Sequence, residues 1–85
     1  MVTEIIIYST LMCPYCVQAK QLLDHKGAEY KEIRIDQEPD KMAEMLSKSG
    51  GRRTVPQIFI GGSHVGGFDD LKALNEQGKL DIMLK

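Results

Sequence analysis

The pattern that most constrains the fold is a β-branched strand followed closely by a helix and then by a second strand. The run Ile5–Ile7 is typical of a strand that is covered on both faces, and we expect this strand to span Val2–Tyr8. A helix is predicted over Pro14–Lys26, because proline suits the first helical position and Gly27 suits the end. The next strand is expected over Glu29–Ile35. A unit of this kind joins two parallel strands by a right-handed crossover.

The rest of the chain predicts a second helix, a hairpin and a third helix. The expected elements are a helix over Asp40–Ser49, strands over Gln57–Ile60 and Ser63–Val65, a helix that is capped by Asp69 or Asp70 and ends near Gly78, and a last helical turn or two over Leu80–Leu84. Because the strands of a hairpin are antiparallel, we expect an α/β fold with a mixed four-stranded sheet, helices on both faces and the order βαβαββα. All 85 residues are assigned to one domain, 1–85.

The charge and the N-terminal segment exclude several classes of protein. The chain has 11 basic and 12 acidic side chains and a net charge of -1, which gives no electrostatic attraction to nucleic acid or to an anionic membrane. Glu4 stands where a signal peptide carries a basic residue, and the apolar run Ile5–Ile7 is too short for a signal peptide or a membrane span. We therefore expect a cytoplasmic protein.

The two cysteines, Cys13 and Cys16, are the strongest functional signal in the chain. In a reducing compartment such a close pair is more often catalytic or metal-binding than structural. A zinc site would need two more ligands, and neither the histidines His25 and His64 nor the aspartates stand at ligand-pair spacing. We therefore expect no metal and interpret the two cysteines as a redox-active pair.

The place of Cys13 at the start of the predicted helix indicates which cysteine attacks. Free N–H groups and the positive end of the helix dipole favour an anion there, so we expect Cys13 to have a lowered pKa and to be the nucleophile. Cys16 lies on the next turn and points towards the face of Ala19 and Leu23, which should make it the more buried thiol. It is therefore expected to resolve a mixed disulfide that Cys13 forms.

Three motifs occur together in this short chain, namely Cys13-Pro14-Tyr15-Cys16, Thr54-Val55-Pro56 and Gly66-Gly67-Phe68-Asp69-Asp70. In this order and at these separations they resemble the dithiol glutaredoxins, above all the small bacterial members, and the resemblance spans almost the whole chain. It implies a thioredoxin-like fold. It also implies a glutathione-dependent thiol–disulfide oxidoreductase that reduces protein disulfides and mixed disulfides of glutathione, in electron transfer and cell redox homeostasis.

The same resemblance assigns a glutathione site. Pro56 is expected to be a cis proline opposite the two cysteines, which leaves the backbone N–H and C=O of Val55 free to pair with a short peptide. The free N–H groups at the start of the third helix can hold the γ-glutamyl carboxylate, and Asp70, assisted by Asp69, is the expected partner of the amino group. The residues expected to bind glutathione are Tyr15, Thr54, Val55, Pro56, Gly67, Asp69 and Asp70, with Arg52 as a further candidate for the second carboxylate.

Three positions depart from the common family pattern. Thr10 stands where many glutaredoxins have a lysine, so part of the cationic support for the thiolate is missing, and Arg52 or Lys20 is a candidate to replace it. Met12 replaces a common threonine or serine and makes the rim of the site more apolar. Phe68 stands where some relatives carry a further cysteine, so no third thiol competes with the pair.

Two rival functions remain open at this point. A thioredoxin-like reductant that is itself reduced by a flavoenzyme would use the same nucleophile, but the segments Thr54–Pro56 and Asp69–Asp70 favour glutathione. An iron–sulfur carrier with a [2Fe–2S] cluster between two subunits is disfavoured by Pro14 and Tyr15, where smaller residues would suit a cluster better. The expected partners are glutathione and disulfide-bonded or glutathionylated proteins. Ribonucleotide reductase and arsenate reductase are candidate substrates, and the chain is expected to be a monomer.

Overall fold

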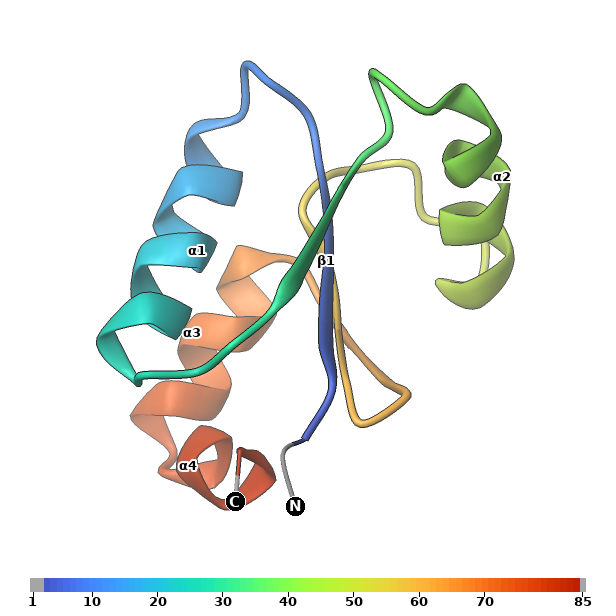
Figure 1. Ribbon diagram of the computed structural model, residues 1–85. Coiled ribbons are helices and arrows are strands. Elements are labelled where there is room, and N and C mark those ends of the chain that lie inside the picture. The colour runs from blue at the N-terminus through green and yellow to red at the C-terminus, as the bar shows by residue number, and fades with distance from the viewer. Residues whose placement is uncertain (1–2, 85) are drawn as a thin grey trace.

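The computed structural model describes residues 3–84, which form a mixed sheet flanked by helices (Figure 1). The elements within this range are, in chain order, β1 (Ile5–Ser9), α1 (Pro14–His25), β2 (Lys31–Arg34), α2 (Pro39–Lys48), β3 (Gln57–Ile60), β4 (Ser63–Gly66), α3 (Phe68–Glu76) and α4 (Lys79–Met83). The predicted order βαβαββα is confirmed, and α4 is the last helical turn that was expected. Val2, the predicted start of the first strand, lies outside the described residues.

The sheet of residues 3–84 has the strand order β2-β1-β3-β4. Strands β1 and β2 are parallel, as the predicted crossover requires, whereas β1 with β3 and β3 with β4 are antiparallel. Tyr8 of β1 lies opposite Ile33 on one side and Gln57 on the other. Strand β2 is an edge strand, and its charged residues Lys31 and Glu32 are exposed, as polar residues at a sheet edge usually are.

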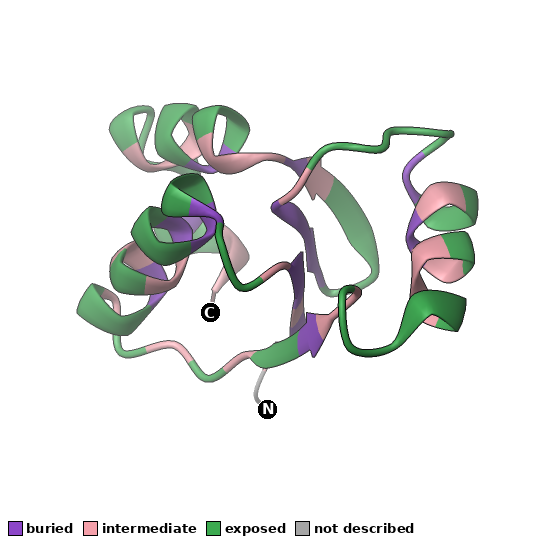
Figure 2. Cartoon of the chain, turned by 90° about the horizontal axis from the view of Figure 1, so that it is seen from above, coloured by how far each residue is buried: buried purple, intermediate pink, exposed green. Residues whose placement is uncertain are grey.

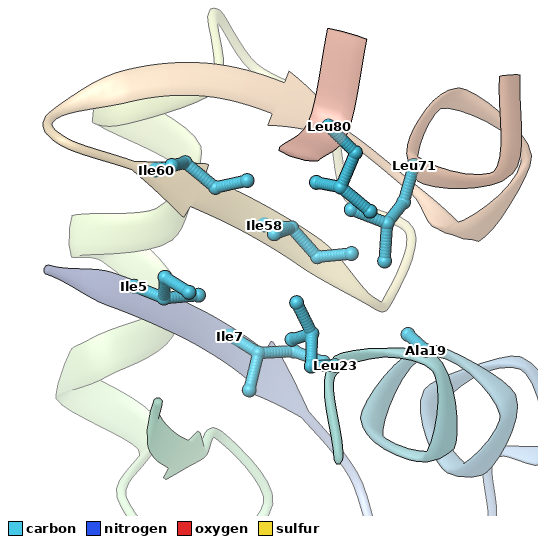
Figure 3. Packing of buried hydrophobic residues seen from close by; sticks show 8 residues of the cluster. All are labelled: Ile5, Ile7, Ala19, Leu23, Ile58, Ile60, Leu71 and Leu80. Carbon is cyan, nitrogen blue, oxygen red and sulfur yellow. The ribbon is translucent and has the colours of Figure 1, made fainter. Parts of the chain in front are cut away.

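Helices cover both faces of the sheet, with α1, α3 and α4 on one face and α2 on the other (Figure 1). In Figure 2 the buried residues lie on the strands and on the helix faces that turn towards them, and the outer helix faces are exposed. The larger of two buried clusters lies between the sheet and the first group of helices (Figure 3). It consists of Ile5, Ile7, Ala19, Leu23, Ile58, Ile60, Leu71 and Leu80.

The second buried cluster lies on the α2 face and contains Tyr8, Ile33, Met45 and Phe59. The two clusters share the strands, because successive side chains of a strand point to opposite faces. The rings of Tyr8 and Phe59 meet edge to face, with 5.7 Å between their centroids. Burial on both faces explains why the first strand is a continuous β-branched run rather than an alternating one.

Helix α1 begins and ends as its sequence predicts, within one residue. Pro14 occupies its first turn, where the missing backbone N–H leaves no hydrogen bond unmade. The C-cap is Lys26, and Gly27 follows with φ +70°, a left-handed conformation that glycine adopts without steric cost. The helix therefore starts directly after Cys13, and this fixed start determines where the first sulfur lies.

The predicted start of the third helix was wrong. Helix α3 begins at Phe68 with Gly67 as its N-cap, so neither Asp69 nor Asp70 is the capping residue. Instead, the Asp70 carboxylate folds back and accepts a hydrogen bond from the Gly67 N–H, with 3.0 Å between Oδ2 and N. An acidic residue in the third helical position can satisfy the capping residue's free N–H in this way. Helix N-caps usually have a polar side chain, so the sequence favoured an aspartate as the cap and placed the start of α3 too late in the chain.

Helix α2 is held to the sheet by a hydrogen bond that creates a pH-dependent contribution to stability. The buried Tyr8 hydroxyl donates to Glu44 Oε2 at 2.6 Å. Burial, reinforced by the Glu44 carboxylate, raises the pKa of Tyr8, and the donated hydrogen bond lowers the pKa of Glu44. A carboxyl group whose pKa is lowered by folding stabilises the protein above its unfolded pKa and loses that contribution as the pH falls through the folded value.

We therefore expect Tyr8→Phe to lower the free energy of unfolding by about 1 kcal/mol near neutral pH, because a typical hydrogen bond contributes this much and the partial exposure of Glu44 weakens the added effect of its charge. The loss should shrink as the pH falls through the pKa of Glu44 in the folded protein, which lies below its ordinary value, because Glu44 is then protonated in both states. Urea unfolding of the native chain and of the Tyr8→Phe variant, near pH 7 and near pH 3, measures this loss of stability. In a Glu44→Gln background the cost of Tyr8→Phe should be the same at both pH values. An equal cost in the native background would contradict the assignment.

Candidate active site

Cys13 and Cys16 form a disulfide at the start of α1, and their Cα atoms lie 5.2 Å apart. Cys13 is the N-cap of the helix, as predicted, and its Sγ accepts a hydrogen bond from the Cys16 N–H at 3.1 Å. Cys13 is 8% exposed and Cys16 only 1%, and the prediction that Cys16 is the more buried sulfur is confirmed. Attack from solvent therefore reaches Cys13 first.

The first turn of α1 favours negative charge on the Cys13 sulfur. It contains no acidic residue, and its free N–H groups and the positive end of the helix dipole face the N-cap. The N–H that now bonds the sulfur in the disulfide also suits a thiolate, since hydrogen bonds to ionised acceptors are stronger than those to neutral ones. After reduction Cys13 is consequently placed to act as a nucleophile.

The loop before β3 brings a second segment to the cysteines. The Val55–Pro56 peptide bond is cis, as the sequence resemblance implied, and the Val55 carbonyl oxygen lies 3.7 Å from Cys13 Sγ. Pro56 is buried, whereas Thr54 is exposed. Residues separated by about forty positions in the chain therefore share one site, and only the pairing of β1 with β3 brings them together.

Gln57 fixes this loop from behind, a role that sequence reasoning missed. Its side chain is fully buried, and its amide nitrogen donates to the Thr54 carbonyl oxygen at 2.9 Å and to Thr54 Oγ1 at 3.2 Å. Its amide oxygen lies 2.7 Å from His64 Nε2. Because a buried amide without partners is costly, these contacts hold the loop against the hairpin. A glutamine at the start of an otherwise apolar strand was the available signal.

A groove of about 280 Å³ opens beside the cysteines. Its lining residues are Tyr15, Arg52, Thr54, Val55, Pro56, Gly67, Phe68, Asp69 and Asp70. The structure thus brings together every residue that the sequence assigned to glutathione, from α1, the loop before β3 and the start of α3. Val55 joins the groove to the cysteine pair, since its carbonyl oxygen is the atom near Cys13 Sγ.

Phe68 is a further groove residue that the sequence reading noted only for the cysteine it replaces. Its ring stacks on that of Tyr15, with centroids 6.4 Å apart and an interplanar angle of 26°. Tyr15 is 58% exposed, so the pair forms an apolar wall with one open face. The sequence shows an aromatic residue in each of the two helix starts, but no pattern within either segment predicts that the two rings meet.

Arg52 and Asp70 face each other at the charged end of the groove. Arg52 Nη1 lies 3.6 Å from Asp70 Oδ2, and both side chains are about half exposed. Gly66 lies directly behind them with φ +120°. A Cβ atom there would lie 2.8 Å from Asp70 Cγ and 2.9 Å from Arg52 Nη1. Of the two glycines, Gly66 is therefore the one that has no room for a side chain. Gly67, with φ -90°, has room for one.

The two cations considered as replacements for the missing lysine have different surroundings. Lys20 forms an ion pair with Glu32 at 2.8 Å, and the same Glu32 oxygen accepts a hydrogen bond from Ser9 Oγ at 2.6 Å. These donors lower the pKa of Glu32, chiefly through Lys20. Lys20 is thus engaged at the sheet edge, while Arg52, which faces Asp70, lines the groove.

Residues 3–84 contain no group of three or more histidine, cysteine, aspartate or glutamate residues that could hold a metal ion. Of the two histidines, His64 is engaged with Gln57, and His25 is exposed in the last turn of α1. No helix in the described part of the chain is long and apolar enough to cross a membrane.

Comparison with known proteins agrees with this geometry. The family model for glutaredoxin matches residues 5–65. A curated glutaredoxin of Pseudomonas aeruginosa is 54% identical over 80 residues, which cover 94% of each chain. The solution structure of a glutaredoxin from Brucella melitensis is 55% identical, with a TM-score of 0.85 and coverage of 99% of this chain and 90% of that one.

A crystal structure of buckwheat glutaredoxin in complex with glutathione has a TM-score of 0.88 and 41% identity, and the match covers 96% of this chain and 76% of that one. With its thioredoxin-like fold and its redox-active cysteine pair, this chain belongs to the glutaredoxin family as a dithiol thiol–disulfide oxidoreductase.

Proposed function

We propose that glutathione is the reductant of this oxidoreductase and that its substrates are protein disulfides and mixed disulfides of glutathione. The observation that carries the proposal is the groove beside Cys13, which joins the Val55 peptide group, a helix N-terminus and a cation in one place. Glutathione is a short peptide with two carboxylates and one ammonium group, so each part has a chemical counterpart there. A relative that is 41% identical, the buckwheat glutaredoxin, was crystallised with glutathione.

In this proposal the groove holds glutathione by its backbone and by its two charged ends. The N–H and C=O of Val55 pair with the peptide, which is how extended peptides commonly bind an open backbone edge. The N-terminal N–H groups of α3 hold the γ-glutamyl carboxylate, and Asp70, with Asp69, pairs with its ammonium. Arg52 takes the glycine carboxylate. Both charged ends then direct the glutathione sulfur towards Cys13.

The proposed reduction of a mixed disulfide uses Cys13 alone. The Cys13 thiolate attacks the glutathione sulfur, a Cys13–glutathione disulfide forms, and the substrate leaves as a thiolate that takes up a proton. A second glutathione thiolate then attacks the same glutathione sulfur. Glutathione disulfide is released and the Cys13 thiolate is restored. In total one glutathione thiol is oxidised and the substrate sulfur is reduced to a thiol, while the glutathione that entered on the substrate stays part of a disulfide throughout.

Reduction of a protein disulfide needs both cysteines in this proposal. Cys13 forms a mixed disulfide with the substrate, and the Cys16 thiolate attacks Cys13 Sγ and releases the second substrate thiol. The product is the Cys13–Cys16 disulfide that the structure contains. Two glutathione molecules then reopen it and leave as glutathione disulfide.

The proposal also places the chain in the cytosol as a monomer. A cysteine pair that is oxidised in every cycle needs a compartment that supplies reduced glutathione. Ribonucleotide reductase and arsenate reductase are candidate protein substrates.

A coupled assay tests the reductant. With glutathione, glutathione reductase and a small mixed disulfide of glutathione, we expect NADPH oxidation that depends on this chain. With thioredoxin reductase in place of glutathione and its reductase, we expect NADPH oxidation to be at least about tenfold slower. The reason is that the groove residues do not assist a flavoenzyme that reduces the cysteine pair directly. A faster reaction with thioredoxin reductase would show that the groove does not serve glutathione.

A further inference from the structure

A chain of side-chain hydrogen bonds runs from the β3–β4 hairpin to the loop beside the cysteines. His64 of β4 lies opposite Phe59 of β3, and Gln57 lies two residues before Phe59 on the same strand. Residues two apart on a strand point to the same face, and diagonal neighbours on paired strands are within reach of long side chains. His64 and Gln57 consequently meet, with 2.7 Å between His64 Nε2 and Gln57 Oε1.

An irregularity in the hairpin sets this diagonal contact. His64 pairs with Phe59, but the next pair along the strands joins Ile58 to Gly66, so Val65 is an extra residue on β4. Such a bulge changes the direction in which nearby side chains point. The His64 ring packs on that of Phe59, with centroids 4.9 Å apart and an interplanar angle of 32°. This contact orients the ring, although the residue as a whole is exposed.

The donor and acceptor roles in this chain of hydrogen bonds follow from the partner of the Gln57 amide nitrogen. That nitrogen lies 2.9 Å from the Thr54 carbonyl oxygen, which can only accept a hydrogen bond. The other end of the amide, Oε1, faces His64 and can itself only accept. His64 must then carry a proton on Nε2, and in the neutral ring Nδ1 is unprotonated. His64 thus donates to Gln57, and Gln57 donates to Thr54.

The Gln57 amide depends on both of these partners. Its side chain is fully buried, and its nitrogen is engaged with the Thr54 carbonyl oxygen and with Thr54 Oγ1. A buried amide oxygen that loses its donor costs free energy, because water does not replace the lost partner. If the amide turned to find another donor, its oxygen would face the Thr54 carbonyl oxygen, and the two acceptors would repel each other. Removal of the His64 donor should therefore loosen the hold of Gln57 on Thr54.

Thr54 immediately precedes the peptide group that the proposed function assigns to glutathione. Both Thr54 and Val55 line the groove, and the Val55 carbonyl oxygen lies 3.7 Å from Cys13 Sγ. His64 is not one of the groove residues, so its effect on a ligand there passes through Gln57. A peptide group that is already held in its binding geometry binds more tightly, since less freedom is lost on binding.

We propose that His64 is a positioning residue for glutathione, which acts through Gln57 to hold Thr54 and Val55 in the geometry that pairs with the ligand. This inference rests on the glutathione site of the proposed function and adds to it a residue outside the groove. Loss of the His64 donor should weaken glutathione binding roughly fivefold, an effect of the size that one hydrogen bond gives. The chemical step at Cys13 should be unchanged.

Two single variants separate the hydrogen bond from the ring packing. His64→Phe keeps a ring against Phe59 and removes the donor, whereas His64→Gln removes the ring and keeps an N–H donor of similar reach. In the coupled assay, we expect the KM for the small mixed disulfide of glutathione to rise roughly fivefold in His64→Phe, with kcat within about twofold of the native value. The KM of His64→Gln should stay within about twofold of the native KM.

The result that would overturn the proposal is an unchanged KM in His64→Phe, because the hydrogen bond would then have no effect on the groove. An equal rise of KM in both variants would also overturn it, since the loss would follow the ring and not the donor. Urea unfolding of each variant shows that it is folded under the assay conditions, so that a change in KM reports on the groove.

The ring tautomer of His64 provides a test that needs no ligand. Long-range 1H–15N correlation spectra of the native chain should show the proton on Nε2 when the ring is neutral. A proton on Nδ1 would overturn the proposal, because the Gln57 oxygen would then have no donor in His64.

The proposed function and this inference fail in different ways. If glutathione is not the reductant, the native chain is inactive in the coupled assay, and both fail together. If only the positioning role is wrong, the native chain is active in that assay and the KM of His64→Phe equals the native KM.

Discussion

Replacement of Cys13 by serine is expected to lower kcat/KM by at least about a thousandfold, both for mixed disulfides of glutathione and for protein disulfides. A serine hydroxyl in the N-cap position still accepts the hydrogen bond from the Cys16 N–H, so the fold of α1 should be kept. It cannot form a disulfide, however, and Cys16 is too deeply buried to replace it as the attacking group. The assays are the coupled reaction with a mixed disulfide and the single-turnover reduction of a peptide disulfide.

The matched variant is Cys16→Ser. The proposed one-cysteine route does not use Cys16, so mixed disulfides should still be reduced within about threefold of the native rate, whereas reduction of protein disulfides should fall by about a hundredfold or more. Mass spectrometry should then show substrate trapped on Cys13. Loss of both activities in Cys16→Ser would refute the proposed division of labour, and retained activity in Cys13→Ser would refute the choice of nucleophile.

Substitution of alanine for Gly66 should damage stability and ligand binding together. Gly66 has φ +120°, a conformation that residues with a Cβ atom rarely adopt, and the new Cβ would press on the Asp70 carboxyl group. Asp70 would have to turn away and give up its hydrogen bond to the Gly67 N–H. We expect the free energy of unfolding to fall by about 1–3 kcal/mol. We also expect the KM for the glutathione substrate to rise by about tenfold, because Asp70 no longer faces the groove.

Gly67→Ser is the control for stability. Gly67 has φ -90°, a Cβ atom there would lie 3.5 Å from the Pro56 carbonyl oxygen, and serine is a favoured N-cap residue. We therefore expect its free energy of unfolding to stay within about 0.5 kcal/mol of the native value. Urea unfolding of both variants measures the difference. Equal destabilisation by the two substitutions would show that the close packing is not specific to Gly66.

The sequence alone determined the order of the elements and the cysteine pair, and it predicted which cysteine attacks. These depend on local chemistry: a β-branched run, a proline and a glycine at the ends of one helix, and a sulfur at a helix start. The family resemblance added the members of the groove, because three short motifs carry them. All of these features lie within segments of a few residues, where the neighbours along the chain are also the neighbours in space.

Only the tertiary structure decided how these segments support one another. The buried side-chain amide of Gln57 donates a hydrogen bond to Thr54. The ring of Phe68 stacks on that of Tyr15. Lys20 forms its ion pair with Glu32 and not with a residue of the active site. Gly66, and not Gly67, is the glycine that packs closely against Asp70. Helix α3 begins at Phe68, before its acidic residues. In each case the partner is distant in sequence or is chosen by competition between several donors and acceptors. Such choices follow from the packing of strands and helices, which no local pattern encodes.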